Sequence, residues 1–247
     1  MSCRFYLGTH QPHWLERTET PLFISRRRMK DRKTYPRARG IWALDSGGFT
    51  ELKDFGTWTV SPRQYASEVK QIAVEVGNMV WAATMDWMCE PVMLAKTGLS
   101  IAEHQARSVR SFLELRDMEP EIPWIPVLQG WERDDYLRCW LMYQNAGVDL
   151  EKQPTVGVGS VCRRQHSDEA LDIFTALRGL KLHGFGLKML GLRKSAHLLT
   201  SADSMAWSFH ARRKPPFCGS TTHINCANCQ WYAEKWREDV VSIPGVE

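Results

Sequence analysis

The chain has 247 residues, of which 43% are hydrophobic and 24% charged, and its net charge is +4. This composition provides a sizeable core, and the length matches a single α/β-barrel domain spanning residues 1–247. No apolar run approaches the roughly 18 residues of a membrane helix, and the N-terminus lacks the pattern of a signal peptide, so we expect a cytoplasmic protein with no membrane partner.

Short apolar runs recur along the whole chain and predict eight β-strands. Most runs are continuous rather than alternating, which is typical of strands buried on both faces. The predicted strands are Arg4–Gly8, Leu22–Ser25, Ile41–Asp45, Met79–Asp86, Trp124–Gln129, Thr155–Gly159, Leu182–Gly186 and Leu198–Asp203.

Helical patterns lie between many of these strands. Capping-box sequences begin two of them, at Ser61 and at Ser100. The predicted helices are Gln64–Val76, Ser100 to about Met118, Asp134–Ala146, Ser167–Leu177 and Cys226–Val240. Residues 12–21 and 26–39 follow the first two strands without clear helical periodicity. Alternating strands and helices predict an α/β fold, a (β/α)8 TIM-type barrel, with an open doubly wound sheet as the alternative.

Polar residues follow the apolar part of five predicted strands. In a barrel, the carboxyl ends of the strands meet on one rim, where functional residues lie. These ends read Asp45-Ser46-Gly47-Gly48-Phe49, Met85-Asp86-Trp87, Gln129-Gly130-Trp131, Gly157-Val158-Gly159-Ser160 and Ala202-Asp203-Ser204. A single aspartate here can simply cap the next helix, but five such ends on one rim favour acid/base or nucleophilic chemistry on a polar ring.

Basic residues gather in two segments. Residues 26–39 hold eight Lys or Arg and one acid, Asp31, and the second group is Arg212, Arg213 and Lys214. Such clusters suit contacts with nucleic-acid phosphates, whereas a single basic run is equally typical of a solvated loop.

Three of the seven cysteines form a cluster with a histidine near the C-terminus. The pattern is Cys218-x4-His223-x2-Cys226-x2-Cys229. A Cys3His set suits tetrahedral Zn²⁺ and, with four protein ligands, a structural role. His210 is an alternative fourth ligand. We therefore predict a zinc-binding loop at 218–229, and we expect the scattered cysteines to be buried thiols rather than disulfides.

The ordered motifs resemble those of the tRNA-guanine transglycosylase superfamily. The segment Asp45-Ser46-Gly47-Gly48-Phe49 resembles its DSGGF motif, and Met85-Asp86, Val127-Leu128-Gln129-Gly130, Val158-Gly159-Ser160 and Ser201-Ala202-Asp203-Ser204 follow in the same order. The chain is most similar to a phage and bacterial branch of DNA-modifying proteins called DpdA.

This resemblance implies a base exchange in which guanine in DNA is replaced by a 7-deazaguanine, such as 7-cyano-7-deazaguanine or a derivative. By position, Asp203 is the expected nucleophile and Asp45 the general acid/base. The expected base-binding residues are Asp86, Gln129, Gly159, Ser160, Ser46, Gly47, Gly48 and Phe49. A phage-encoded member would act in the host cytoplasm.

Departures from the transfer-RNA enzymes favour DNA as the polymer. Thr50 follows DSGGF where those enzymes carry Gln, the surroundings of Asp203 differ, and no RNA-binding domain is added. Three alternatives stay open: a tRNA-guanine transglycosylase, a non-catalytic zinc-containing nucleic-acid-binding protein, and a barrel hydrolase acting on free nucleosides.

Overall fold

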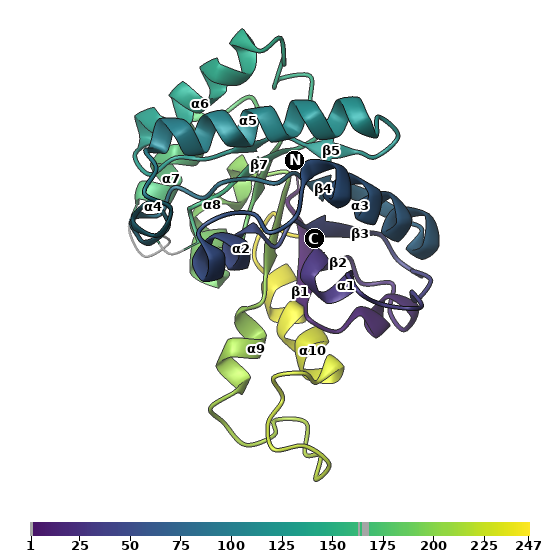
Figure 1. Ribbon diagram of the computed structural model, residues 1–247. Helices are drawn as coiled ribbons and strands as arrows, with labels where there is room; N and C mark the ends of the chain where they lie inside the picture. Colours follow the sequence, from purple (N-terminus) through teal and green to yellow (C-terminus); the bar gives the residue numbers. More distant parts are fainter. Residues whose placement is uncertain (1, 163, 165–167) are drawn as a thin grey trace.

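The computed structural model describes residues 2–162, 164 and 168–247. Its strands are all parallel and join in one sheet (Figure 1). They are β1 (Arg4–Thr9), β2 (Leu22–Ser25), β3 (Trp42–Asp45), β4 (Met79–Ala83), β5 (Trp124–Ile125), β6 (Val127–Leu128), β7 (Val156–Val158), β8 (Leu182–Gly184) and β9 (Ser201–Ser204).

The sheet follows the strand order β5-β4-β3-β2-β1-β9-β8-β7-β6. Its two ends, β5 and β6, are separated only by Pro126, which has no N–H to donate to a strand ladder. The Pro126 carbonyl still accepts from Gly157 N at 2.9 Å. The predicted strand Trp124–Gln129 is therefore divided at its proline, and the sheet closes into the predicted barrel rather than an open doubly wound sheet.

Helices surround the barrel, as Figure 1 shows for α3, α5 and α6. The α-helices are α1 (Arg26–Met29), α2 (Gly48–Phe55), α3 (Pro62–Val76), α4 (Pro91–Thr97), α5 (Ile101–Met118), α6 (Arg133–Asn145), α7 (Glu169–Ala176), α8 (Met189–Ser195), α9 (Ala206–Ala211) and α10 (Gln230–Val241). Two 3-10 helices, η1 (Pro12–Glu16) and η2 (Ala196–Leu198), complete them.

Several predicted boundaries move. The Ser100–Glu103 capping box forms in both directions, but at Ser61 only half forms, because the Gln64 side chain bonds Glu68 instead. The last helix begins at Gln230, after the cysteines, and residue 167 of the predicted helix 167–177 lies outside the described residues.

The core has two layers. Inside the barrel, aromatic side chains of Tyr6, Phe23 and Trp81 pack with small and β-branched residues of the other strands. Between the barrel and its helices lies the larger layer, which includes Trp42, Tyr65 and Phe174. None of the described helices is both long and apolar enough to cross a membrane.

Candidate active site and metal centre

A cavity of about 450 Å³ opens at the carboxyl ends of the strands. It brings together residues that are far apart in sequence, because parallel strands end on one rim. The predicted site residues that line it are Asp45, Phe49, Asp86, Gln129, Gly159, Ser160 and Asp203. Ser46, Gly47 and Gly48 do not line it; they form the turn that leads from β3 into α2.

The two predicted catalytic aspartates lie on β3 and β9, which are separated in the sheet by β2 and β1. Asp45 ends β3, where it pairs with Ser25 of β2, and Asp203 of β9 pairs with Tyr6 of β1. Both carboxylates face the same cavity.

The carboxyl group of Asp45 has a raised pKa. Burial raises its pKa to about 7, and the negative charges of Asp86 and Asp203 raise it too, against hydrogen bonds from the Ser25 hydroxyl and Gly47 N. The Gly47 amide donates to Asp45 Oδ2 at 3.1 Å. Gly47 has φ +79°, a conformation that favours glycine, and this turn aims the amide back at Asp45. A carboxyl with a pKa near neutrality can both donate and accept a proton.

Asp86 is fixed by hydrogen bonds to both of its oxygens. Ser46 Oγ donates to Oδ1 at 2.9 Å and Gln129 Nε2 donates to Oδ2 at 2.6 Å. Burial raises the Asp86 pKa to about 6, although these two bonds lower it. An ionised carboxylate has about four acceptor positions, so Asp86 keeps two for a ligand after binding Ser46 and Gln129.

Ser160 connects this network to Glu90, which the sequence analysis missed. Ser160 Oγ lies 2.8 Å from Gln129 Oε1 and 2.9 Å from Glu90 Oε2, and accepts from Cys89 N at 2.9 Å. Its φ of +58° is unusual for a residue other than glycine and costs about 1–3 kcal/mol, which these bonds offset. Glu90 is buried, lines the cavity and lies in a loop before Pro91, where no strand-end pattern points to it.

Gly159 makes room for this arrangement. A Cβ on Gly159 would lie 2.2 Å from Gln129 Nε2. Only glycine therefore lets the Gln129 side chain reach Asp86 past the end of β7. This is a steric reason for the glycine and does not require contact between Gly159 and a base.

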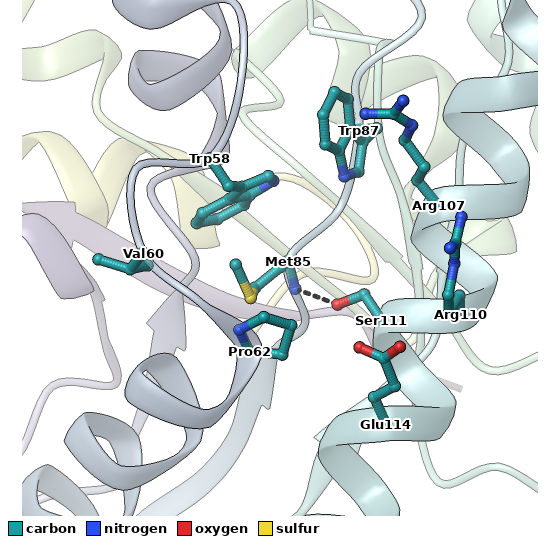
Figure 2. A pocket seen from close by; sticks show the side chains of 9 residues that line it. All are labelled: Trp58, Val60, Pro62, Met85, Trp87, Arg107, Arg110, Ser111 and Glu114. Carbon is teal, nitrogen blue, oxygen red and sulfur yellow. Dashed lines mark hydrogen bonds between the residues drawn. The ribbon is translucent and has the colours of Figure 1, made fainter.

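The segment around Asp86 is held from outside the barrel, as Figure 2 shows. Ser111 Oγ of α5 accepts from Met85 N at 3.0 Å, and Ser108 Oγ accepts from Trp87 N at 2.8 Å. Trp58 Nε1 donates to the Asp86 carbonyl at 3.3 Å. A separate outer hollow of about 280 Å³ lies against this segment, lined by Trp58, Met85 and Trp87 among others.

The cysteine cluster assembles in the loop between α9 and α10, which extends away from the barrel (Figure 1). The ligand atoms of Cys218, His223, Cys226 and Cys229 all lie within 4.8 Å of one another. Cys218 Sγ is 3.2 Å from His223 Nε2 and 3.5 Å from Cys226 Sγ. Zinc bonds of about 2.0–2.3 Å in a tetrahedron place two sulfurs roughly 3.8 Å apart and a sulfur and a nitrogen roughly 3.5 Å apart, so these four residues could hold a metal ion with little movement.

His210, the alternative fourth ligand, does not join the cluster. Its Nδ1 lies 2.8 Å from Tyr232 Oη, and its ring stacks on Phe217 at 5.8 Å.

The comparison with known protein families agrees with this geometry. The model of the family DpdA, described as DeoxyPurine in DNA protein A, matches residues 1–246. The chain belongs to the DpdA family. Membership implies a transglycosylase that takes part in deazapurine modification of DNA. No curated protein matches the chain.

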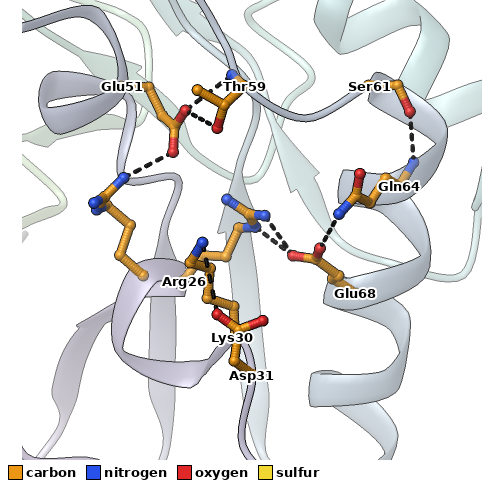
Figure 3. Close-up of polar contacts among 9 residues, drawn as sticks. Arg26, Lys30, Asp31, Glu51, Thr59, Ser61, Gln64 and Glu68 are labelled. Atoms are coloured by element: carbon orange, nitrogen blue, oxygen red, sulfur yellow. Dashed lines mark hydrogen bonds and ion pairs between the residues drawn. The ribbon is translucent and has the colours of Figure 1, made fainter. Parts of the chain in front are cut away.

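The first basic segment of this DpdA-family chain is divided: two of its arginines form internal ion pairs, whereas Arg28, Arg32, Lys33, Arg37 and Arg39 are exposed. Arg26 is fully buried and donates Nε to Glu68 Oε2 at 2.6 Å (Figure 3). Arg27 Nη1 donates to Glu51 Oε1 at 2.8 Å, and Glu51 also accepts from Thr59. These ion pairs connect α1, which follows β2 directly, to α2 and α3.

Arg28 differs from its neighbours because it lies at the cavity. Its Nη2 is 3.1 Å from Nδ1 of His10, a residue that lines the cavity. Burial, together with the charges of Arg28 and Arg212, lowers the His10 pKa to about 4. One arginine from each basic segment, Arg28 and Arg212, is therefore near enough to His10 to act on its charge.

Proposed function

We propose that this chain exchanges guanine in DNA for a 7-deazaguanine through a covalent intermediate on Asp203. The observation that carries the proposal is that Asp45 and Asp203 face one cavity, whose far side holds the bonded pair Asp86 and Gln129. A retaining exchange needs a nucleophile, an acid/base group and a site for the base, and each has a candidate here.

Recognition of the base falls to Asp86 and Gln129. The two free acceptor positions of Asp86 suit the N1–H and N2–H groups of guanine, and the remaining Gln129 N–H suits O6. Guanine and 7-deazaguanines share this edge and differ at position 7. One site can therefore hold the leaving base and then the incoming one. Phe49 lines the cavity and offers a ring for stacking.

In the first half of the reaction, an Asp203 carboxylate oxygen bonds to C1′ of the target nucleotide. The C1′–N9 bond breaks, its electron pair leaves on guanine, and the protonated Asp45 neutralises the departing base. In the second half, Asp45 takes the N9 proton of the 7-deazaguanine, N9 bonds to C1′, and the bond to Asp203 breaks. Two inversions retain the configuration at C1′.

The target nucleotide must leave the base stack to enter the cavity, which costs a few kcal/mol in duplex DNA. Arg28 and Arg212 at the rim, with Arg213 and Lys214 after α9, supply positive charge for the flanking phosphates. The zinc that fits the Cys3His set would fold the loop following these residues and would take no part in the bond changes.

The test is the release and incorporation of labelled guanine by the full chain, with DNA and transfer RNA as separate substrates. We expect exchange with DNA, loss of exchange in Asp203→Asn, and no loss in Asp149→Asn, an exposed aspartate in the loop before β7. Exchange with transfer RNA alone would reject DNA as the substrate. If the wild type binds DNA but exchanges no guanine, the result would favour a non-catalytic DNA-binding protein.

Analysis of nucleosides from the DNA of cells that express the chain and receive a 7-deazaguanine tests the incoming base. A modified nucleoside that disappears with Asp203→Asn supports the proposal, and its absence in the wild type contradicts it.

A further inference from the structure

A buried histidine lies directly below the candidate nucleophile. His183 is in the middle of β8, is fully buried, and is the register partner of Ser201 in β9. Ser201 and Asp203 are two residues apart on one strand, so their side chains point to the same face. The imidazole lies between them: Nδ1 is 2.9 Å from Ser201 Oγ, and Nε2 is 3.3 Å from Asp203 Oδ1.

The ring is held in place by the aromatic interior of the barrel. Four rings surround it, with centroids 4.7 Å away for Trp81 and Phe185, 5.7 Å for Phe23 and 6.1 Å for Tyr6. Among the described residues, Nε2 has no hydrogen bond of good geometry. A buried imidazole nitrogen without a partner is costly, and Asp203 Oδ1 is the polar atom within its reach.

We propose that His183 is a positioning residue for Asp203, and this inference rests on the proposed function. In the tautomer in which the Ser201 hydroxyl donates to Nδ1, the ring N–H is at Nε2 and points toward Asp203 Oδ1. Gly186 N donates to the same oxygen at 2.9 Å. The Gly186 amide and, in that tautomer, the His183 ring N–H then both face Oδ1, whereas no hydrogen bond from a described residue reaches Oδ2. Oδ2 is consequently the oxygen that attacks C1′.

This arrangement explains why a polar residue interrupts an apolar strand inside the barrel. A leucine at 183 would fill the space but leave Asp203 held by Gly186 alone, free to turn about its side-chain bonds. Misplacement of a reacting group by about 1 Å can cost 100-fold in rate. Glutamine can place its Nε2 near the position of the histidine Nε2, whereas leucine cannot donate at all.

The experiment compares His183→Leu, His183→Gln and Ser201→Ala in the full chain, by guanine exchange and by crystal structures. We expect His183→Leu to lower kcat by 10- to 100-fold, with the KM for guanine within twofold of the wild type. His183→Gln should recover most of that loss, and Ser201→Ala should lower kcat less than His183→Leu. His104→Gln, which changes another fully buried histidine, serves as the control for lost packing.

Crystal structures give the readout that does not depend on activity. We expect the Asp203 carboxylate to rotate in His183→Leu and to keep its position in His183→Gln. If His183→Leu does not fold, Ser201→Ala carries the same test through a smaller rotation. An unmoved Asp203 with unchanged kcat overturns the inference even if exchange itself is confirmed. A wild type without exchange rejects the proposed function, and the Asp203 rotation then still decides whether His183 positions this carboxylate.

Discussion

Gln129 donates its side-chain amide to Asp86 Oδ2 across 2.6 Å, although the two residues are 43 positions apart in the chain. The contact joins the ends of β4 and β6, on either side of the place where the barrel closes. It also determines which Gln129 atoms face which partner, because a carboxylate can only accept from the amide nitrogen. The base recognition that we propose for this pair therefore depends on the barrel being closed.

Gln129→Glu should weaken binding of the incoming base. The substitution places a second carboxylate against Asp86 and removes an N–H donor, and the loss of such a buried partner costs about 1–3 kcal/mol. We expect kcat/KM for guanine to fall by roughly 5- to 150-fold, the change that this cost represents. Steady-state exchange with varied guanine concentration measures it.

The matched control is Gln71→Glu. Gln71 Nε2 donates to Glu75 Oε1 at 2.8 Å on the exposed surface of α3, so the same chemical change occurs there in water. Unchanged kinetics in Gln71→Glu with a loss in Gln129→Glu would assign the effect to the site. Equal kinetics in both variants would remove Gln129 from base recognition.

Expulsion of guanine should slow as pH rises above about 7. Asp45 must carry a proton to neutralise the leaving base, and burial, with the charges of Asp86 and Asp203, raises its pKa to about 7. Above that pKa the protonated fraction falls about tenfold per pH unit. Rapid-quench measurement of labelled guanine release at pH 5 to 9 tests this, with Asp45→Asn expected to be slow throughout. A release rate that stays constant from pH 6 to 9 would exclude Asp45 as the acid.

The stability of the fold reports the same pKa independently. Asp45 binds a proton more tightly in the folded chain than in the unfolded chain, so its ionisation destabilises the fold as pH rises from about 4 to about 7. The stability of Asp45→Asn relative to the wild type should therefore increase over this range and then level off, by at most about 1.4 kcal/mol per pH unit. Urea unfolding at pH 4 to 8 measures the difference, and a flat difference contradicts the raised pKa.

The strand ends could be read from the sequence because their signal is local. An apolar run followed by Asp45, Asp86 or Asp203 places a carboxylate on the rim once the barrel is expected. His183 gives no such signal, since it lies alone within an apolar strand and its partners come from the register with β9. Glu90 lies in a loop, and only the folded chain brings it to Ser160.

The basic segments show the same limit. The sequence does not distinguish the eight cations in residues 26–39 from one another. Whether each is paired inside the structure or exposed depends on acids elsewhere in the chain. Arg26 and Arg27 form ion pairs with Glu68 and Glu51, whereas Arg28 contacts His10. The cysteine cluster, in contrast, was predictable because its ligands lie within twelve residues of one another.

Arg212→Ala should weaken DNA binding and reduce its salt dependence. Arg212 lies close enough to His10 at the cavity rim to lower its pKa, a position suited to a phosphate beside the flipped nucleotide. Loss of one phosphate contact should lower the slope of log K against log salt by about 1. Fluorescence anisotropy with labelled DNA at several salt concentrations measures it.

The control is Lys152→Ala, which removes an exposed cation before β7, at the opposite end of the barrel. It should leave the slope unchanged. A similar drop in slope in Lys152→Ala would indicate a nonspecific charge effect.

Cys226→Ala should lose zinc and stability together. Cys226 is fully buried, its sulfur lies 3.5 Å from Cys218 Sγ, and the loop it anchors is tied to α9 by the Ser208 hydroxyl, which donates to the Ala227 carbonyl at 2.7 Å. A structural zinc contributes its binding free energy to folding, so a chelator should lower the melting temperature of the wild type and have little further effect on Cys226→Ala. Metal analysis and thermal unfolding give both readouts.

Cys139→Ala, which changes a fully buried cysteine outside the cluster, should lose some stability through packing but keep one zinc per chain. We propose that the metal holds the loop and takes no part in the bond changes. Any exchange activity left in Cys226→Ala should then show the same pH dependence as the wild type, and a shifted profile would instead place the metal in the chemistry.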